Sequence, residues 1–157
     1  MDINQITALS KQGESPTLEY KTSTTQLKPA FETLCAFLNK KGGILLIGVK
    51  NNGEIIGQDV TDNTRQDISR EIKKIEPPIQ IEVNYIKTKN GRFVIALEAT
   101  HGHHAPYVYD GRPYDRIESS TVLMSQHLYE QLIVKRGQLN HSWEIQPANN
   151  FSIDNLA

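Results

Sequence analysis

The sequence predicts an α+β fold, in which a mixed, mostly antiparallel sheet of hairpins packs with three to four helices. Three dipeptides typical of hairpin turns separate apolar or alternating segments; they are Asn52-Gly53, Asn90-Gly91 and Asp110-Gly111. The helical segments lie between these hairpins and do not alternate regularly with the strands. No repeated βαβ unit is therefore expected, and the predicted order of elements is α-β-α-ββ-α-ββ-ββ-α.

The N-terminal segment predicts a short helix and then a strand. Residues 2–10 place apolar side chains at helical spacing, with Asp2 in the N-cap position. Residues 18–21 alternate between apolar and polar. Because successive side chains of a strand point to opposite faces, we expect a half-buried strand whose solvent-facing side carries Glu19 and Lys21.

The clearest helix is predicted for residues 27–40, with Gly42 just beyond its end. Its apolar stripe comprises Phe31, Leu34, Cys35 and Leu38. Residues 43–49 form an uninterrupted apolar run, which is typical of a central strand buried on both faces. The turn at Asn52-Gly53 then predicts that residues 54–57 pair back as the next strand.

The second half of the chain predicts a helix, two hairpins and a last helix. Asp62 or Asn63 is expected to cap a helix that runs to about residue 75. Ser125 caps the last helix, which Gly137 closes. The strands expected between these helices are residues 79–88, 92–99, 107–109 and 114–117.

The length of 157 residues fits one domain with a real core. We expect that domain to cover residues 1–137. Residues 138–157 show no periodicity and few apolar anchors, which predicts a tail or a linker to a C-terminal region that continues the protein.

The bulk composition indicates a cytoplasmic protein without a membrane partner. A net charge of −1 excludes binding of nucleic acid by overall charge alone, so any such binding needs a local basic patch. The single cysteine, Cys35, excludes an internal disulfide framework and suits a reducing compartment. No apolar run approaches the length of a membrane span.

Four groups of residues occur in a characteristic order. They are Glu14-Ser15 with Glu19-Tyr20-Lys21, Cys35–Asn39 with Gly42-Gly43, Ile47-Gly48-Val49 with Gly53–Gly57, and Pro106-Tyr107 with Gly111–Arg116. Over about residues 10–136, the chain resembles the Schlafen AlbA-type DNA-binding domain. The resemblance implies a mixed α+β fold and nucleic-acid binding. It also implies the N-terminal module of a bacterial transcriptional regulator or helicase-related protein, followed by effector domains.

A related domain in vertebrate Schlafen proteins is an RNA-cleaving nuclease with three carboxylates. Glu14 and Glu19 match the first two acids by spacing, provided that the chain bends between them. Asn51 stands at the third position and follows Lys50. An amide brings no charge to a hard-cation site, so we expect the two glutamates to orient neighbouring lysines. Catalysis by Glu14 and Glu19 with Mg²⁺ or Mn²⁺ is the alternative.

Five residues are expected to contact a nucleic-acid backbone. The resemblance places Lys21 and Arg116 at matching positions, while Arg112 comes from the last hairpin and Lys50 and Asn51 from a hairpin tip. A solvated surface is the competing interpretation of these cations.

Two further clusters leave alternatives open. The loop histidines His101, His103 and His104 lack the partners of a zinc site, so no metal is expected and a solvent-facing loop is favoured. Three tyrosines of the last hairpin either stack on bases or fill the core; they are Tyr107, Tyr109 and Tyr114.

The expected function is a nucleic-acid-binding module that needs no cofactor, with a DNA or RNA backbone as partner. A metal-dependent endonuclease is the second interpretation. A protein-interaction or dimerisation module, with a homodimer as partner state, is the third, because hairpin edges can pair with another chain.

Overall fold

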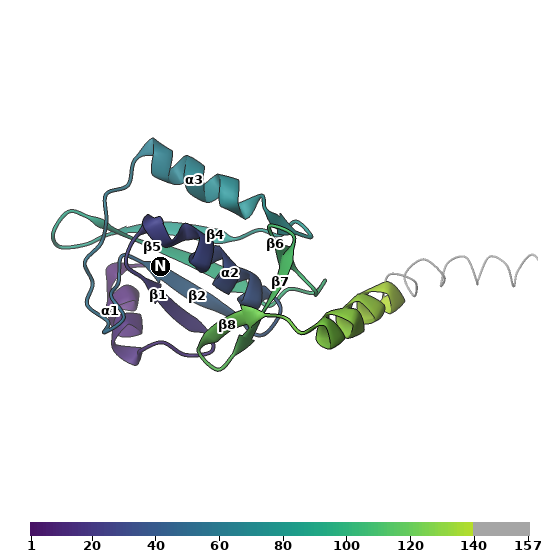
Figure 1. Ribbon diagram of the computed structural model, residues 1–157. Coiled ribbons are helices and arrows are strands. Elements are labelled where there is room, and N and C mark those ends of the chain that lie inside the picture. Colours follow the sequence, from purple (N-terminus) through teal and green to yellow (C-terminus); the bar gives the residue numbers. More distant parts are fainter. Residues whose placement is uncertain (140–157) are drawn as a thin grey trace, which may run out of the picture.

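The computed structural model describes residues 1–139 and confirms the α+β class (Figure 1). Almost all of the expected tail, residues 140–157, lies outside the described residues. The elements are α1 (Ile3–Gln12), β1 (Leu18–Lys21), the short 3₁₀ turn η1 (Thr24–Gln26), α2 (Leu27–Leu38), β2 (Gly42–Ile47), α3 (Asp62–Ile72), β3 (Ile75–Glu76), β4 (Glu82–Lys87), β5 (Phe93–Thr100), β6 (Val108–Tyr109), β7 (Arg112–Ile117) and β8 (Ser120–Leu123). A C-terminal helix covers residues 126–139.

The strands form two four-stranded sheets. The first has the order β1-β2-β5-β4, and the second has the order β3-β6-β7-β8. All pairs are antiparallel except β1 with β2, which are parallel and in register from Leu18 opposite Ile44 to Lys21 opposite Ile47. Because β1 and β2 are consecutive parallel strands, the chain must cross over between them, and α2 is that crossover.

Helix α2 lies between the two sheets. It packs on β2 and β5 of the first sheet and on β6, β7 and β8 of the second. The predicted apolar stripe is buried, and so are positions on its other sides, including Ala30, Thr33 and Ala36. A helix that is apolar around most of its circumference needs cover on more than one face. The second sheet supplies that cover.

Helix α1 covers the opposite face of the first sheet. Its Ile6 packs with Leu18, Tyr20 and Leu46 in a second hydrophobic cluster. The Tyr20 hydroxyl donates to the Leu9 carbonyl at 2.5 Å, which ties β1 to the end of α1. Asp2 caps α1 as predicted, accepting a hydrogen bond from the Gln5 amide at 2.9 Å.

The expected strand at residues 54–57 is wrong. The turn itself is present, because the Gly53 amide donates to the Lys50 carbonyl at 2.8 Å and the Lys50 amide donates to the Glu54 carbonyl at 2.9 Å. Only an isolated bridge between Val49 and Ile55 follows. Both sides of β2 are already paired, with β1 and β5. The returning segment therefore has no free edge of β2 to join.

Four helix boundaries also differ from the prediction. Thr61, and not Asp62 or Asn63, caps α3, because its side chain accepts from the Thr64 amide. Helix α3 ends at Ile72, so that Ile75 begins β3. Helix α2 ends at Leu38, and Gly42 is the first residue of β2. At the C-terminal helix Ser125 is the cap as predicted, whereas Gly137 lies inside the helix and does not close it.

The two remaining hairpins are confirmed. Asn90-Gly91 joins β4 to β5, and Asp110-Gly111 joins β6 to β7. Both Asp110 (φ 51°) and Gly111 (φ 81°) have positive φ, the conformation of a type I′ turn. The partner strand β8, which pairs with β7, was not predicted from the sequence.

Candidate functional site

Glu19 lies on the face of β1 that is covered by α2. Tyr20 and Leu18 point to the α1 side, so the alternation of the strand turns Glu19 towards α2. There Thr33 of α2 donates its hydroxyl to Glu19 Oε2 at 3.2 Å. Glu19 is only 7% exposed, so its predicted solvent-facing position is wrong. The cause is the second sheet, which closes over the edge of β1.

Arg116 of β7 holds the other oxygen of Glu19. Its Nη2 lies 3.3 Å from Glu19 Oε1 and donates to the Ser15 carbonyl at 2.9 Å. Its Nη1 donates to the Thr121 hydroxyl of β8 at 2.9 Å, and its guanidinium lies over the ring of Phe37. The side chain is 1% exposed. Arg116 therefore connects the second sheet to β1. A direct contact with a nucleic-acid backbone would require an exposed side chain, and Arg116 is buried.

Lys21 completes the group on the solvent side. Its Nζ lies 3.3 Å from Glu19 Oε2, and its side chain is 16% exposed. We call Glu19, Lys21, Thr33, Arg116 and Thr121 the Glu19 cluster. Two cations share one carboxylate in this cluster, so it carries an excess of positive charge beside the end of β1.

Glu14 binds β1 at a different place. The segment from Ser15 to Leu18 is a tight turn, with the Ser15 amide donating to the Leu18 carbonyl at 2.9 Å, and it supplies the expected bend. Glu14 Oε1 accepts from the Tyr20 amide at 3.0 Å. Since β1 pairs only with β2, Glu14 satisfies a backbone donor on the open edge of the sheet.

The residues of this region do not fit a three-carboxylate metal site. Both oxygens of Glu19 are engaged by Arg116, Lys21 and Thr33. Among the described residues, no group of three or more His, Cys, Asp or Glu side chains could hold a metal ion. Asn51 lies in an exposed turn and contributes no charge. A divalent cation would therefore have to displace existing ion pairs to bind Glu19.

The segment that leads to Lys50 and Asn51 is hydrogen-bonded to the backbone of Lys21. The amides of Gly48 and Val49 both donate to the Lys21 carbonyl, at 2.7 and 3.1 Å. The exposed turn that begins with Lys50 therefore follows directly at the carboxyl ends of β1 and β2. Lys50 pairs with Glu54 at 3.1 Å.

Gly53 fixes that turn against α1. Its φ of 91° favours glycine, and a Cβ atom there would lie 2.3 Å from the Ser10 carbonyl. The turn cannot accept a side chain at this position without moving away from α1.

Arg112 lies away from this group. It is exposed at the first position of β7, opposite Tyr109, whereas Arg116 is four residues further along. Four residues of a strand span about 13 Å. Of the five predicted contacts, the structure thus gathers Lys21, Lys50 and Asn51 at one end of the first sheet.

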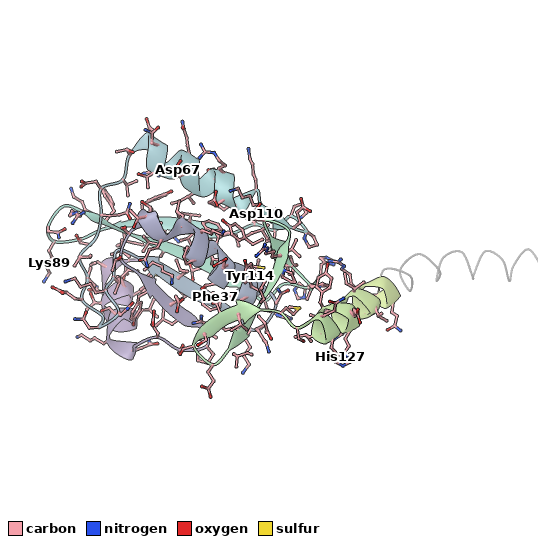
Figure 2. The ribbon with its side chains drawn as sticks, in the orientation of Figure 1. Phe37, Asp67, Lys89, Asp110, Tyr114 and His127 are labelled. Atoms are coloured by element: carbon pink, nitrogen blue, oxygen red, sulfur yellow. The ribbon has the colours of Figure 1, made fainter. Side chains whose placement is uncertain are left out.

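The three tyrosines of the last hairpin fill the core. Tyr107, Tyr109 and Tyr114 are 1%, 2% and 7% exposed, so stacking on bases is excluded in this conformation. Tyr114 donates to Glu32 at 2.7 Å, and burial together with this bond raises the pKa of Tyr114 to about 12. Figure 2 labels Tyr114 and Phe37 where α2 meets the second sheet. The histidines of the loop are exposed, as expected; they are His101, His103 and His104.

The fold and the Glu19 cluster define an α+β domain in which a polar contact joins two sheets around a central helix. A family model described as Schlafen, AlbA_2 matches residues 14–125, and the chain belongs to this family. The match spans β1 through β8 and includes every residue of the Glu19 cluster.

Two solved structures share the fold. One is the crystal structure of the DIP2311 protein from Corynebacterium diphtheriae, with a TM-score of 0.56 and 19% identity over 81% of this chain and 30% of that one. The other is the solution structure of the N-terminal domain of a RecG-related, helicase-type protein from Nitrosomonas europaea. It has a TM-score of 0.53 and 22% identity over 78% of this chain and 95% of that one.

The chain thus spans less than a third of the Corynebacterium protein but corresponds to nearly all of the Nitrosomonas domain. Among curated proteins no sequence matches it. Within residues 1–139, none of the helices has the length and apolar character needed to span a bilayer.

Proposed function

We propose that this domain binds the sugar-phosphate backbone of a nucleic acid, with DNA as the first candidate, at the carboxyl ends of β1 and β2. The observation that carries the proposal is that Lys21 and Arg116 share one carboxylate, Glu19. Two cations and one carboxylate leave an excess of positive charge, which a phosphate group of the ligand would balance. Membership of the Schlafen AlbA_2 family and the likeness to a domain of a helicase-related protein support the same class of ligand.

The residues have different roles in this proposal. Lys21 donates to a phosphate oxygen, because one acceptor occupies only part of the capacity of an ammonium group. Lys50 and Asn51 contact the next part of the backbone from the adjacent turn, and Arg112 serves at the periphery. Arg116 is a positioning residue, since it holds Glu19, which in turn orients Lys21.

The wider setting is part of the same proposal. The domain acts in the cytoplasm as the N-terminal module of a transcriptional regulator, and effector domains in the rest of the protein use its binding. Backbone binding at this place needs no cofactor. Nucleolytic cleavage with Mg²⁺ or Mn²⁺ is the alternative outcome of the test below, because no group of three or more ligating side chains within residues 1–139 could hold a metal ion.

The test is a titration of the chain with single- and double-stranded DNA and RNA at several salt concentrations. We expect the double variant with Lys21→Ala and Lys50→Ala to reduce the slope of log affinity against log salt by about two. Lys89→Ala is the matched control, because Lys89 is exposed in the β4–β5 turn, and it should leave the slope unchanged.

Two results would overturn the proposal. The first is equal loss of binding in the double variant and in the Lys89 control, which would indicate non-specific attraction. The second is cleavage in the presence of Mn²⁺ that Glu14→Gln abolishes, which would establish the nuclease function instead. Glu14→Gln suits this purpose because Glu14 is exposed and its loss leaves the Glu19 cluster intact.

A further inference from the structure

The four outer strands of the two sheets differ in how their edges are protected. Strand β1 is covered by Glu14 and by the turn at Ser15, which Arg116 holds. Strand β4 carries the exposed charges Glu82 and Lys87, and β3 is two residues long and is followed by two prolines. Charges, prolines and shortness are the usual means of preventing edge-to-edge pairing.

Strand β8 lacks the charges that protect β4 and the prolines that follow β3. Its residues Ser120–Leu123 include no charge and no proline. Val122 and Leu123 are 38% and 56% exposed, and Ile117 of the adjoining β7 is 57% exposed. Within the part of the chain that the structure describes, no strand pairs with the outer side of β8. Figure 1 shows β8 at the surface of the body, next to the helix that leads away from it.

The register of β7 and β8 determines which backbone groups face outwards. The Met124 amide donates to the Pro113 carbonyl at 3.0 Å, and Ile117 opposite Ser120 closes the two-residue turn. Hydrogen-bonded and non-hydrogen-bonded pairs alternate along an antiparallel ladder. The amides and carbonyls of Thr121 and Leu123 therefore point away from β7, towards the open edge.

We propose that β8 pairs antiparallel with β8 of a second copy of this chain, about a twofold axis that passes beside Val122. Thr121 then exchanges hydrogen bonds with Leu123 of the second copy, and the reverse pair forms by symmetry. Val122 faces its own equivalent at a non-hydrogen-bonded site. Its methyl groups lose contact with water there.

A second copy is the occupant favoured by the chemistry of the strand. An uncharged strand offers no pattern for recognising an acidic or basic partner. Antiparallel pairing with itself, in contrast, satisfies all outward backbone groups of both strands at once. The strand is short, so the interface belongs to the small, reversible class, and we expect dissociation in the micromolar range.

Cross-linking tests the register. In Val122→Cys, the two introduced thiols would lie across a non-hydrogen-bonded pair with Cα atoms about 4.5 Å apart, a separation that permits a disulfide. The native Cys35 is buried, and burial raises the pKa of its thiol to about 12, so it should stay silent. We expect rapid formation of a covalent dimer under mild oxidation, several-fold faster than for the exposed control Lys89→Cys.

Sedimentation of the full chain tests the association itself, without nucleic acid. The average mass of the native chain should rise towards that of a dimer with concentration. Val122→Lys should hold it at the monomer mass, because two ammonium groups would face each other at the axis. Val122→Thr keeps the β-branched shape and should retain the dimer. An unchanged circular dichroism melt shows that Val122→Lys still folds.

Three outcomes would overturn the dimer. They are a native chain that stays monomeric throughout the micromolar range, dimerisation that survives Val122→Lys, and equal rates of cross-linking at positions 122 and 89. Pairing of β8 with a strand of another protein would show itself as the first of these.

Discussion

Two ion pairs of this domain have almost the same length and opposite surroundings. Glu19 and Arg116 lie 3.3 Å apart with side chains 10% and 1% exposed, and Lys50 and Glu54 lie 3.1 Å apart with side chains 49% and 57% exposed. In water the high dielectric weakens the attraction within such a pair. At a buried site the free-energy cost of removing both charges from water can exceed their attraction. The comparison teaches that distance alone does not tell which pair stabilises the fold and which is free for a ligand.

The buried pair also has more partners. Glu19 binds Thr33 and Lys21 in addition to Arg116, and Arg116 binds Ser15 and Thr121. These contacts join β1, α2, β7 and β8. The exposed pair joins only the two ends of one turn. We therefore assign the buried pair mainly to the structure and the exposed pair mainly to recognition.

The largest effect is expected for Glu19→Gln. The substitution leaves the Arg116 guanidinium buried without a counter-charge, which costs about 3–5 kcal/mol of the free energy of unfolding. Urea denaturation, followed by circular dichroism, measures it. The control is Glu54→Gln, which changes the exposed pair and should cost less than about 1 kcal/mol. Equal costs for the two variants would contradict the distinction between the pairs.

Tyr114→Phe examines a case between these extremes, since Glu32 is half-buried and accepts from the Tyr114 hydroxyl. At neutral pH, loss of the hydrogen bond should cost about 1 kcal/mol. In the native chain the pKa of Tyr114 is raised from 10.0 to about 12, by burial first and then by Glu32.

The pH dependence follows from the direction of that shift. A raised pKa favours the protonated hydroxyl in the folded state, so its contribution to stability is complete below pH 10. The contribution is lost as the pH rises to about 12. We expect urea midpoints between these values to fall less steeply for Tyr114→Phe than for the native chain. Parallel slopes would show that Tyr114 titrates as an ordinary tyrosine.

Much of the fold could be predicted from local patterns. Contacts between residues close in sequence determine several elements. These are the cap at Asp2, the central strand and the hairpins at Asn90-Gly91 and Asp110-Gly111. The strand expected after Asn52-Gly53 failed because its place beside β2 is taken by β5, a competition between segments far apart in sequence. Strand β8 was missed because it lacks strong alternation and forms only by pairing with β7.

The candidate site could be predicted only in part. Lys21, Lys50 and Asn51 lie at the same end of the first sheet, because the Gly48 and Val49 amides donate to the Lys21 carbonyl. Their contact with a nucleic acid stays a prediction. The burial of Glu19 and Arg116 was not foreseen, because it depends on the second sheet covering β1. One signal was present in the sequence: Thr33 is a polar residue in the midst of the apolar helix α2, and it contacts Glu19. A lone hydroxyl in such a helix often marks a buried polar partner.

The smallest effect is also the one most specific to recognition. Glu54→Gln should leave stability nearly unchanged but release Lys50 and remove a negative charge from the proposed phosphate contact. We expect affinity for DNA to rise about two- to fivefold at low salt, with the gain vanishing as salt screens the charges. Asp67→Asn is the matched control, because it releases Arg70 from a similar exposed pair on α3, away from the end of β1. An equal gain in both variants would mean that only the net charge matters, and that the turn at Lys50 is not where the backbone binds.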